Sequence, residues 1–514
     1  MKAASLVLAV LLVGCGHHSL NADSGLGSDD SMSGDDANGS DDGNTGSDGG
    51  PGSDGGPGSD GGPGSDGGNT DGNTGGDGGN NNDGGGSGDG NTGPGACGLT
   101  VCAKAFSSGT DGAALAVAVD SANNVYIAGL AESDLVFGTH TIFQLGARDA
   151  FVVSFAADGT YRWAKRWGNG TKLAGAYGIA VDASNNIYIV GGMTGAVDFG
   201  GGLVGTQGMF VASFDTNGNY RWARGDGGGS GLLAVAVADG KVFGIGRFLN
   251  SVTFSPTTTL TSAGAEDVVV AAFDTATGGF AWARSVGTAA TDIEGGIVAR
   301  TGVLAFTMSS GVIGTGERLV SWTTAGADRW STPLPAALDL RGLSVDAAGT
   351  LFVSGLHTGG IDVVPNAPYV NGDNEYVHAY TDGGSTGTSA WSWTLSESPA
   401  HTVTAIPLTP SALDPAHDLV LAGTYEGTLY TGSTTLTSGN RTIFLAKYST
   451  TGTPLAARRL DDASTAANEY VHGVAIATTG TTYVVGVYYG APNFGDGALP
   501  FASQGGVMIL RVAP

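Results

Sequence analysis

Positive charge is scarce in this chain. Its 514 residues contain 21 lysines and arginines against 47 aspartates and glutamates, so the formal net charge is −26 at pH 7. Proteins that bind nucleic acid neutralise its phosphates with clustered Lys and Arg side chains, and no basic patch stands out here. Nucleic acid is therefore not an expected partner.

Long apolar runs and helical periodicity are missing beyond the first residues. Residues 3–13 form a short apolar run, and no later run approaches the roughly 18 apolar residues that a membrane-spanning helix needs. No segment shows a sustained 3.6-residue hydrophobic period. We expect almost no helix, and lipid is the expected means of any membrane anchoring.

Cysteine is also rare. Of the three cysteines, Cys97 and Cys102 form a close pair where the folded part is expected to begin, and a local disulfide is expected in an oxidising compartment. A metal site would need further thiols or clustered histidines, and the eight histidines are scattered. No metal site is predicted.

The third cysteine, Cys15, follows the N-terminal apolar run. Residues 12–15 read Leu-Val-Gly-Cys, and Lys2 precedes the run. This pattern resembles the lipobox of bacterial lipoprotein signal peptides, which implies that Cys15 becomes an acylated N-terminus. A short apolar helix or an ordinary signal peptide remains the alternative, although an ordinary cleavage site needs no cysteine. We expect residues 1–14 to be a lipoprotein signal peptide, and the mature chain to be anchored by lipid at the outer membrane or cell surface of a bacterium.

Residues 15–95 contain very few apolar side chains. Gly, Asp, Ser, Asn, Thr and Pro dominate, so this segment is predicted to be a disordered linker that holds residues 96–514 away from the membrane. Fifteen aspartates and no Lys, Arg or Glu lie between residues 20 and 95, so more than half of the net negative charge belongs to the linker. Bound Ca²⁺ is an open alternative, although no Asp-x-Asp-x-Asp ligand run occurs. No other cofactor is expected.

A repeated module organises residues 96–514. Residues 178–191 alternate small and β-branched apolar residues around Asp182-Ala-Ser-Asn-Asn186, and residues 209–222 do the same around Asp215-Thr-Asn-Gly218. Each half predicts two short strands joined by a turn. Related segments recur at intervals of roughly 50–65 residues, and repeats of this length with four antiparallel strands are typical of a β-propeller.

The turn glycine of the second half is followed four residues later by tryptophan in five modules. The pairs are Gly159/Trp163, Gly218/Trp222, Gly278/Trp282, Gly326/Trp330 and Gly387/Trp391. Glycine supplies the positive φ that a tight hairpin needs. We interpret the tryptophans as packing between neighbouring sheets.

The last module ends early, because residues 506–512 are not followed by a fourth strand. Residues 102–106 align with residues 163–167, so an N-terminal strand can complete the last blade and close the ring without a free edge. The predicted fold is therefore all-β, a seven-bladed β-propeller of four-stranded antiparallel blades. Because the fourth module is degenerate, six blades remain an alternative.

These modules resemble the bacterial cell-surface β-propeller repeat family. The shared features are the motif Asp-x-x-Gly/Asn-Asn-x-Tyr-x-x-Gly and a following Phe-Gly segment, found at Phe137-Gly138, Phe199-Gly200 and Phe494-Gly495. The resemblance covers about residues 96–514 and implies a surface or secreted β-propeller. It carries no catalytic residues that could be transferred to this chain.

The longer connections share one face of such a ring, since the short turns share the other. A binding site is expected on the long-connection face or in the mouth of the central channel. The polar candidates there are Asp292, Glu294, His401, Asp461, Asp462, Glu469 and His472. They could bind a cation or a sugar, and the alternative is a solvated loop surface.

No catalytic constellation is recognised. Residues 383–387 match Gly-x-Ser-x-Gly, but a nucleophile elbow needs a strand and a helix around that motif. Residues 274–282 look like the tryptophan-docking motif of quinoprotein dehydrogenase propellers, where the motif is structural. We favour a monomeric, non-enzymatic module that binds a protein or glycan. A quinoprotein-like or glycan-active enzyme and a purely structural surface protein are the alternatives.

Overall fold

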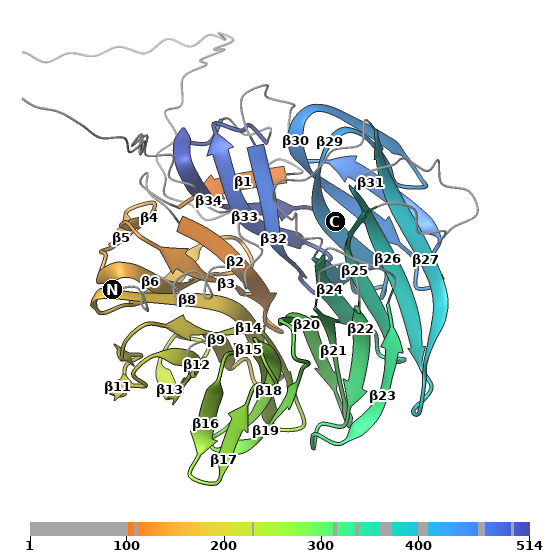
Figure 1. The fold of residues 1–514 in the computed structure, drawn as a ribbon. Coiled ribbons are helices and arrows are strands. Elements are labelled where there is room, and N and C mark those ends of the chain that lie inside the picture. Colours follow the sequence, from red (N-terminus) through yellow and green to blue (C-terminus); the bar gives the residue numbers. More distant parts are fainter. Residues whose placement is uncertain are drawn as a thin grey trace, which may run out of the picture. The chain divides into compact units, whose positions relative to one another are not determined.

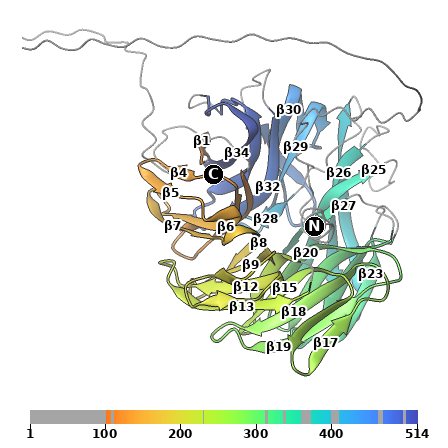
Figure 2. The ribbon, with the colours of Figure 1, turned by 60° about the vertical axis from the view of Figure 1, so that its left-hand side comes forward.

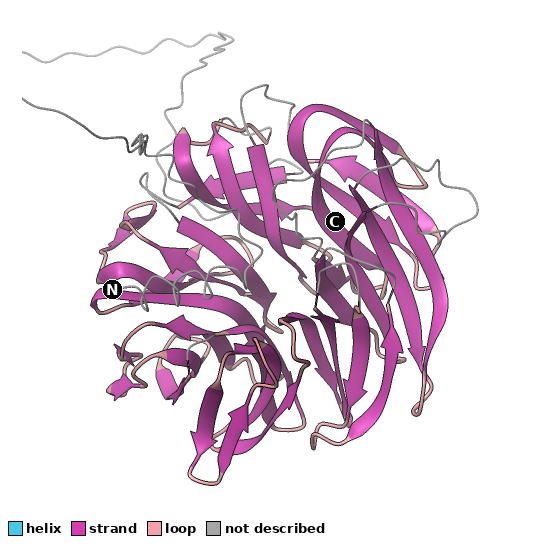
Figure 3. Cartoon of the chain, viewed as in Figure 1, coloured by secondary structure: helices cyan, strands magenta, loops and turns pink. Residues whose placement is uncertain are grey.

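The computed structural model describes residues 101–106, 112–228, 231–311, 316–334, 339–358, 373–398, 410–460, 468–494 and 498–514. The predicted signal peptide and linker lie outside these ranges. Within them the regular structure consists of β-strands, with no helix (Figure 3). This confirms the all-β prediction for the described part of the chain.

The strands form successive antiparallel modules of four, which we number in chain order. Modules one and two consist of β2 (Gly112–Val119), β3 (Val125–Ala131), β6 (Gly146–Phe155) and β7 (Tyr161–Trp167), then β8 (Gly170–Val181), β9 (Ile187–Met193), β12 (Gly208–Phe214) and β13 (Tyr220–Gly227). Modules three and four consist of β14 (Leu232–Ala238), β15 (Lys241–Phe248), β18 (Asp267–Asp274) and β19 (Phe280–Val286), then β20 (Asp292–Arg300), β21 (Val303–Ser310), β22 (Arg318–Trp322) and β23 (Asp328–Pro333).

The C-terminal modules repeat this order. Modules five and six consist of β24 (Asp339–Val345), β25 (Thr350–Thr358), β26 (Asp373–Asp382) and β27 (Gly387–Ser398), then β28 (Ser411–Leu413), β29 (Leu419–Tyr430), β30 (Thr435–Tyr448) and β31 (Pro454–Arg459). Module seven consists of β32 (Asn468–Ile476), β33 (Thr482–Gly490), β34 (Ala502–Val512) and β1 (Val101–Ala105). The predicted degenerate module four is thus a complete four-stranded sheet.

Two strand pairs join neighbouring modules into larger sheets. A parallel pair of β6 with β8 links modules one and two, and a pair of β27 with β29 links modules five and six. Among the described residues, the sheets with four or more strands therefore number five. The arrangement is that of a β-propeller (Figure 1).

The N-terminal strand completes the last module, as the alignment of residues 102–106 predicts. β1 runs antiparallel to β34, with Cys102 opposite Arg511 and Ala105 opposite Met508. Figure 1 shows the orange β1 beside the blue β34. The outer edge of β34 is therefore covered by a strand from the other end of the chain.

The Asp-x-x-Asn-Asn-x-Tyr segments form short turns held by the aspartate. Asp120 Oδ1 accepts hydrogen bonds from the amides of Ala122 and Asn124 (2.9 and 2.8 Å), and Oδ2 accepts one from the Tyr126 hydroxyl (2.8 Å). Asn123 has a φ of 62°, which asparagine tolerates better than most residues. The turn around Asp182 repeats this arrangement. These residues therefore fix the turn geometry.

Each repeated tryptophan docks on the following module. Trp222 Nε1 donates to the carbonyl oxygen of Thr275 (3.0 Å), and a Cβ placed on Gly278 would lie 2.5 Å from the Trp222 ring. The same relation joins Trp163 to Gly218, Trp282 to Gly326, Trp330 to Gly387 and Trp391 to Gly452. The prediction of packing between sheets is confirmed, and each ring covers the turn glycine of its neighbour.

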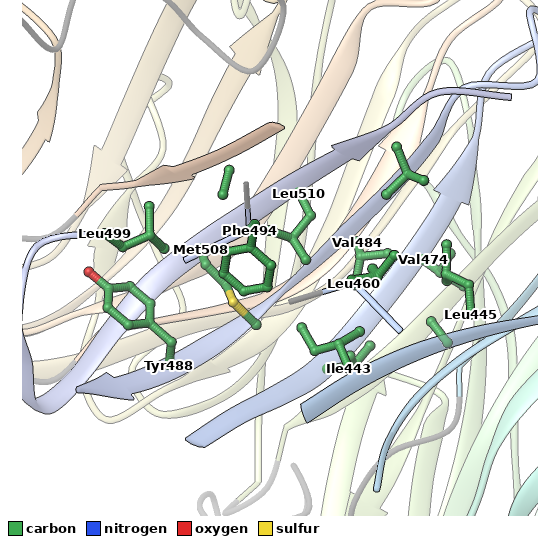
Figure 4. Close-up of a cluster of buried hydrophobic side chains, with 14 of the residues drawn as sticks. Ile443, Leu445, Leu460, Val474, Val484, Tyr488, Phe494, Leu499, Met508 and Leu510 are labelled. Atoms are coloured by element: carbon green, nitrogen blue, oxygen red, sulfur yellow. The ribbon is translucent and has the colours of Figure 1, made fainter. Parts of the chain in front are cut away.

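The hydrophobic cores also lie between consecutive modules. One cluster combines Ile443 and Leu445 of β30 with Val484 of β33 and Leu510 of β34 (Figure 4). Burying these faces against one another supplies the main driving force for holding the modules side by side.

Hairpins lie in several connections between the second and third strands. They are β4 (Leu135–Phe137) with β5 (His140–Ile142), β10 (Val197–Asp198) with β11 (Leu203–Val204), and β16 (Ser251–Ser255) with β17 (Thr258–Thr261). The amide of Val136 donates to the carbonyl of Phe106, so the first hairpin lies beside the end of β1 (Figure 2). Phe137 and Phe199 are 4% and 2% exposed, so the Phe-Gly segments are buried packing elements.

Candidate functional site

The first strand of each of six modules carries a β-bulge at the same point. The register shifts between Ala114 and Ala116, Ala176 and Gly178, Leu232 and Ala234, Glu294 and Ile297, Asp339 and Gly342, and Val471 and Gly473. In five of these modules the inserted residues are Leu115, Tyr177, Leu233, Gly295 with Gly296, and His472. A bulge redirects the side chain of the extra residue, and these residues all line one cavity.

This cavity has a volume of about 260 Å³ and lies among the first strands of the modules. Residues from β2, β8, β14, β20, β24 and β32 line it, together with Pro410 just before β28. Leu115, Tyr177 and Leu233 belong to one hydrophobic cluster with Leu130, so one part of the wall is apolar. Glu294 and His472 contribute polar groups to the lining.

Glu294 belongs to a buried group of charges between modules three and four. Its Oε2 lies 2.8 Å from Nε of Arg247, and Arg247 Nη1 lies 3.2 Å from Oε2 of Glu266. The Arg247 and Glu294 side chains are 3% and 1% exposed. Two carboxylates therefore share the Arg247 guanidinium.

The position of Glu294 is apolar in modules one, two, three and seven, whereas module five has Asp339 there. Ala114, Ala176, Leu232 and Val471 occupy the same place, directly before the bulge. The repeat architecture therefore does not require a charge there. A buried ion pair usually contributes little net stability relative to apolar packing, so packing alone gives no reason for it.

His472 joins module seven to module one. Its Nδ1 lies 2.9 Å from the carbonyl oxygen of Ala114. A carbonyl oxygen can only accept, so we assign the proton to Nδ1, and the neutral ring then carries its lone pair on Nε2. The ring is thereby oriented at the cavity wall.

Asp292 closes the connection that precedes β20. Its Oδ2 accepts hydrogen bonds from the amide and hydroxyl of Thr288 (2.7 and 3.2 Å), and the residue is fully buried. Asp267 holds the amide of Ala263 in the same way (3.0 Å). Burial, with a smaller contribution from the Asp292 charge, raises the pKa of Asp267. Asp292 therefore has a structural role in the loop.

The structure places four candidate residues in strands, where the sequence placed loops. Asp292 and Glu294 lie in β20, and Glu469 and His472 lie in β32. Asp292, Glu294 and Glu469 are buried, so a solvated loop surface is the wrong interpretation for them. β20 and β32 begin earlier in the sequence than their local composition suggests, because their first residues are polar although they lie at the buried inner ends of the modules.

The other predicted site residues are not placed. His401, Asp461, Asp462, Cys15 and Cys97 lie outside the described residues. Cys102 is buried at 0% exposure, and its pairing with Cys97 stays a prediction. In the part of the chain that the structure describes, no group of three or more His, Cys, Asp or Glu could hold a metal ion. Within those same ranges, no helix is long and apolar enough to cross a bilayer.

Sequence reasoning missed Arg247, Tyr177 and the bulge glycines. A bulge residue breaks the alternation that predicts a strand, so the alternation alone places it on neither face of the sheet. Aligning the modules at the small residue after the bulge, which is Ala116, Gly178 or Ala234, would have shown the residue directly before it.

The predicted turn at residues 383–387 is present. It joins β26 to β27, and the amide of Gly383 donates to the carbonyl of Thr386 (2.9 Å). Nearby, His378 Nε2 lies 2.7 Å from Ser389 Oγ. Burial lowers the pKa of His378 to about 4, which makes it a weak base at neutral pH. The pair is better suited to packing than to activating a nucleophile.

Comparison with known proteins gives no family. No family model matches the sequence, and no curated protein matches it. Several solved structures have a similar fold. The WD40 domain of Neurospora crassa Pan2 has 10% identity and a TM-score of 0.42, covering 79% of this chain and 89% of that one.

Two further solved structures are also similar to this chain. BamB from Moraxella catarrhalis has 13% identity and a TM-score of 0.32, covering 70% of this chain and 88% of its own. The quinohemoprotein alcohol dehydrogenase from Comamonas testosteroni has 10% identity and a TM-score of 0.36, covering 80% and 76%. At such levels no activity is transferred.

Proposed function

We propose that this protein is a lipid-anchored, non-enzymatic binding module whose β-propeller binds its ligand at the central cavity. The observation that carries the proposal is the cavity of about 260 Å³ among the first strands. It joins an apolar wall to the polar residues Glu294 and His472, which are 178 positions apart in sequence. A concave, mostly apolar site with a few convergent polar groups is the usual form of a ligand pocket.

We further propose that each module is one blade, which gives seven. Strands from six modules line the cavity and Pro410 precedes the first strand of the remaining one, as expected when every blade sends its first strand to a common axis. The pairs that join modules are short, with two partner positions between β6 and β8 and three between β27 and β29. The six-bladed alternative would exclude module four, yet Gly295 of β20 lines the cavity.

The anchor is proposed from the sequence around Cys15 and the acidic linker. A Cys15→Ser change should move the full-length protein from the membrane to the soluble fraction, because the lipid would have no attachment point. Fractionation of cells that express either form measures this. A Cys15→Ser protein that stays in the membrane fraction would contradict the anchor.

The ligand is proposed to be a protein or glycan that reaches the cavity from the long-connection face. Full-length protein in detergent, wild type and Gly295→Leu, is applied to a glycan array and to a panel of purified surface proteins. Wild type should retain a ligand that Gly295→Leu loses, because leucine would fill the cavity. Equal binding by both forms would show that the cavity is not the site. The absorbance spectrum of the same sample tests the quinoprotein alternative, since a bound quinone absorbs visible light.

A further inference from the structure

Two aspartates meet where module three is followed by module four. Asp267 begins β18 and Asp292 begins β20, and the amide of Asp292 donates to the carbonyl of Glu266 (2.7 Å). A Cβ placed on Gly287 would lie 2.1 Å from Cγ of Asp267. The next residue, Thr288, donates its amide hydrogen to Asp292 Oδ2 (2.7 Å). The two carboxyl groups therefore lie against adjacent residues of one loop.

Both carboxyl groups are buried and only partly hydrogen-bonded. Asp267 and Asp292 are 3% and 0% exposed. Oδ2 of each accepts a loop amide, whereas Oδ1 of each is buried without a hydrogen-bond partner. In the part of the chain that the structure describes, no Lys, Arg or His forms an ion pair with either group. Besides burial, the charge of Asp292 raises the pKa of Asp267, as expected of neighbouring carboxyl groups. Two like charges buried together need a compensating group.

Module one shows how such a carboxylate is compensated. Asp149 occupies the position of Asp267, because each lies opposite the last residue of the second strand, and Oδ2 of each accepts the amide four residues earlier. Arg166 Nε lies 2.6 Å from Asp149 Oδ2, although Oδ1 of Asp149 again has no hydrogen-bond partner. The strand registers place Ser285 at the position of Arg166. Module three therefore lacks the cation that neutralises this position in module one.

Module four supplies a second carboxylate in place of a cation. Counted from the bulge, Asp292 occupies the position of Ala174 at the start of module two. The junction of modules one and two thus combines one carboxylate with one guanidinium. The junction of modules three and four combines Asp267 with Asp292, and a divalent cation would balance these two charges.

We propose that Asp267 and Asp292 bind one Ca²⁺ ion between modules three and four. Ca²⁺ takes oxygen ligands from carboxylates, main-chain carbonyls and water, so loop carbonyl oxygens and water complete the set. The two loops that precede these strands are in contact, since a Cβ on Gly264 would lie 2.4 Å from the carbonyl oxygen of Ala289. The ion holds these loops together. This inference is independent of the binding function proposed above.

The test follows thermal unfolding of the full-length protein in detergent, first in EGTA and then with added CaCl₂ or MgCl₂. Ca²⁺ at about 100 times its Kd should raise the unfolding temperature by about 3 °C, because it binds the folded state. Mg²⁺ should raise it less, since Mg²⁺ gives up its water reluctantly. No shift with Ca²⁺ would overturn the proposal and indicate a proton shared by the two aspartates. An equal shift with Mg²⁺ would overturn the assignment to Ca²⁺.

Two variants locate the site. Asp292→Asn should lose the Ca²⁺ shift, and Asp328→Asn is the matched control that keeps it, because the Asp328 side chain is 74% exposed. Ser285→Arg introduces the guanidinium that module one has at this position. It should unfold at a higher temperature than wild type in EGTA and no longer respond to Ca²⁺, which tests the site even if Asp292→Asn does not fold. An undiminished Ca²⁺ shift in folded Asp292→Asn or in Ser285→Arg would overturn the proposal.

Discussion

Asp226 should make the protein less stable as the pH rises through 4 to 6. It lies in β13, four residues after Trp222, and the equivalent positions hold Trp167, Val286, Leu334, Leu395 and Leu460. Burial raises the pKa of Asp226 from its ordinary value of 3.8 to about 6, against a smaller opposing effect of Arg224. A carboxylate therefore stands where other modules pack apolar side chains.

The sign of the pH dependence of stability follows from the raised pKa of Asp226. Because the folded-state pKa is the higher one, the folded protein holds the proton more tightly than the unfolded chain does. Below its pKa in the unfolded chain, the Asp226 carboxyl does not lower the free energy of unfolding. The destabilisation is complete once the pH has passed its pKa in the folded protein. A shift of about two units corresponds to about 3 kcal/mol, and screening by water at this partly exposed side chain lowers the expectation to about 2 kcal/mol.

The experiment compares wild type with Asp226→Asn, which keeps the shape of the side chain and removes its titration. Urea unfolding, followed by tryptophan fluorescence at several pH values from 4 to 8, gives the unfolding midpoints. The variant should be more stable by up to about 2 kcal/mol above pH 6, and the advantage should disappear near pH 4. Asp226→Leu should gain further, because it adds apolar burial. Identical pH dependence of Asp226→Asn and wild type would refute the reasoning.

The remaining predictions concern packing and buried charge. Trp222→Ala should cost about 3–5 kcal/mol in urea unfolding, because it leaves a cavity over Gly278. Gly278→Ala should destabilise through its φ of 67° and its contact with Trp222, and a double-mutant cycle should show coupling between the two sites; strictly additive effects would contradict the docking. Arg166→Met should cost about 3–5 kcal/mol, because Asp149 is fully buried and lies 2.6 Å from Arg166. Adding Asp149→Asn should restore part of that stability, and no recovery would argue against the ion-pair explanation.

The repeat pattern made the scaffold predictable from the sequence. Asp182, Asn186 and Tyr188 recur at fixed spacing because one carboxylate serves two amides and a hydroxyl, so the turn and its two strands can be inferred locally. The tryptophans were predicted to lie between sheets. Their partner glycines were not predicted, because each pair joins hairpins of different modules, and the sequence presents the glycine and tryptophan of one hairpin together.

The cavity was predictable only in part. Glu294 and His472 were singled out as acidic or titratable residues on the expected face, and both line the cavity. Their burial and strand positions were not expected, since strand ends with polar residues look like loops in a sequence. Arg247 is the penultimate residue of the otherwise largely apolar β15, and nothing local indicates that its partner is Glu294 of the next module.

Aligning the fourth strands of the modules shows how the ring closes. The tryptophan position holds Ala456 in β31 and Cys102 in β1, so the docking contact is absent on both sides of module seven. Other contacts take its place there: Arg458 donates to the carbonyl of Ala513 (3.1 Å), and the amide of Thr478 donates to the side chain of Asn123 (2.8 Å). A large ring side chain on β1 would have to dock at the same time as the two chain ends meet. Because small residues occupy this junction, the ring is closed by strand pairing and apolar packing. These contacts require less exact placement of the two strands than docking a tryptophan over a glycine.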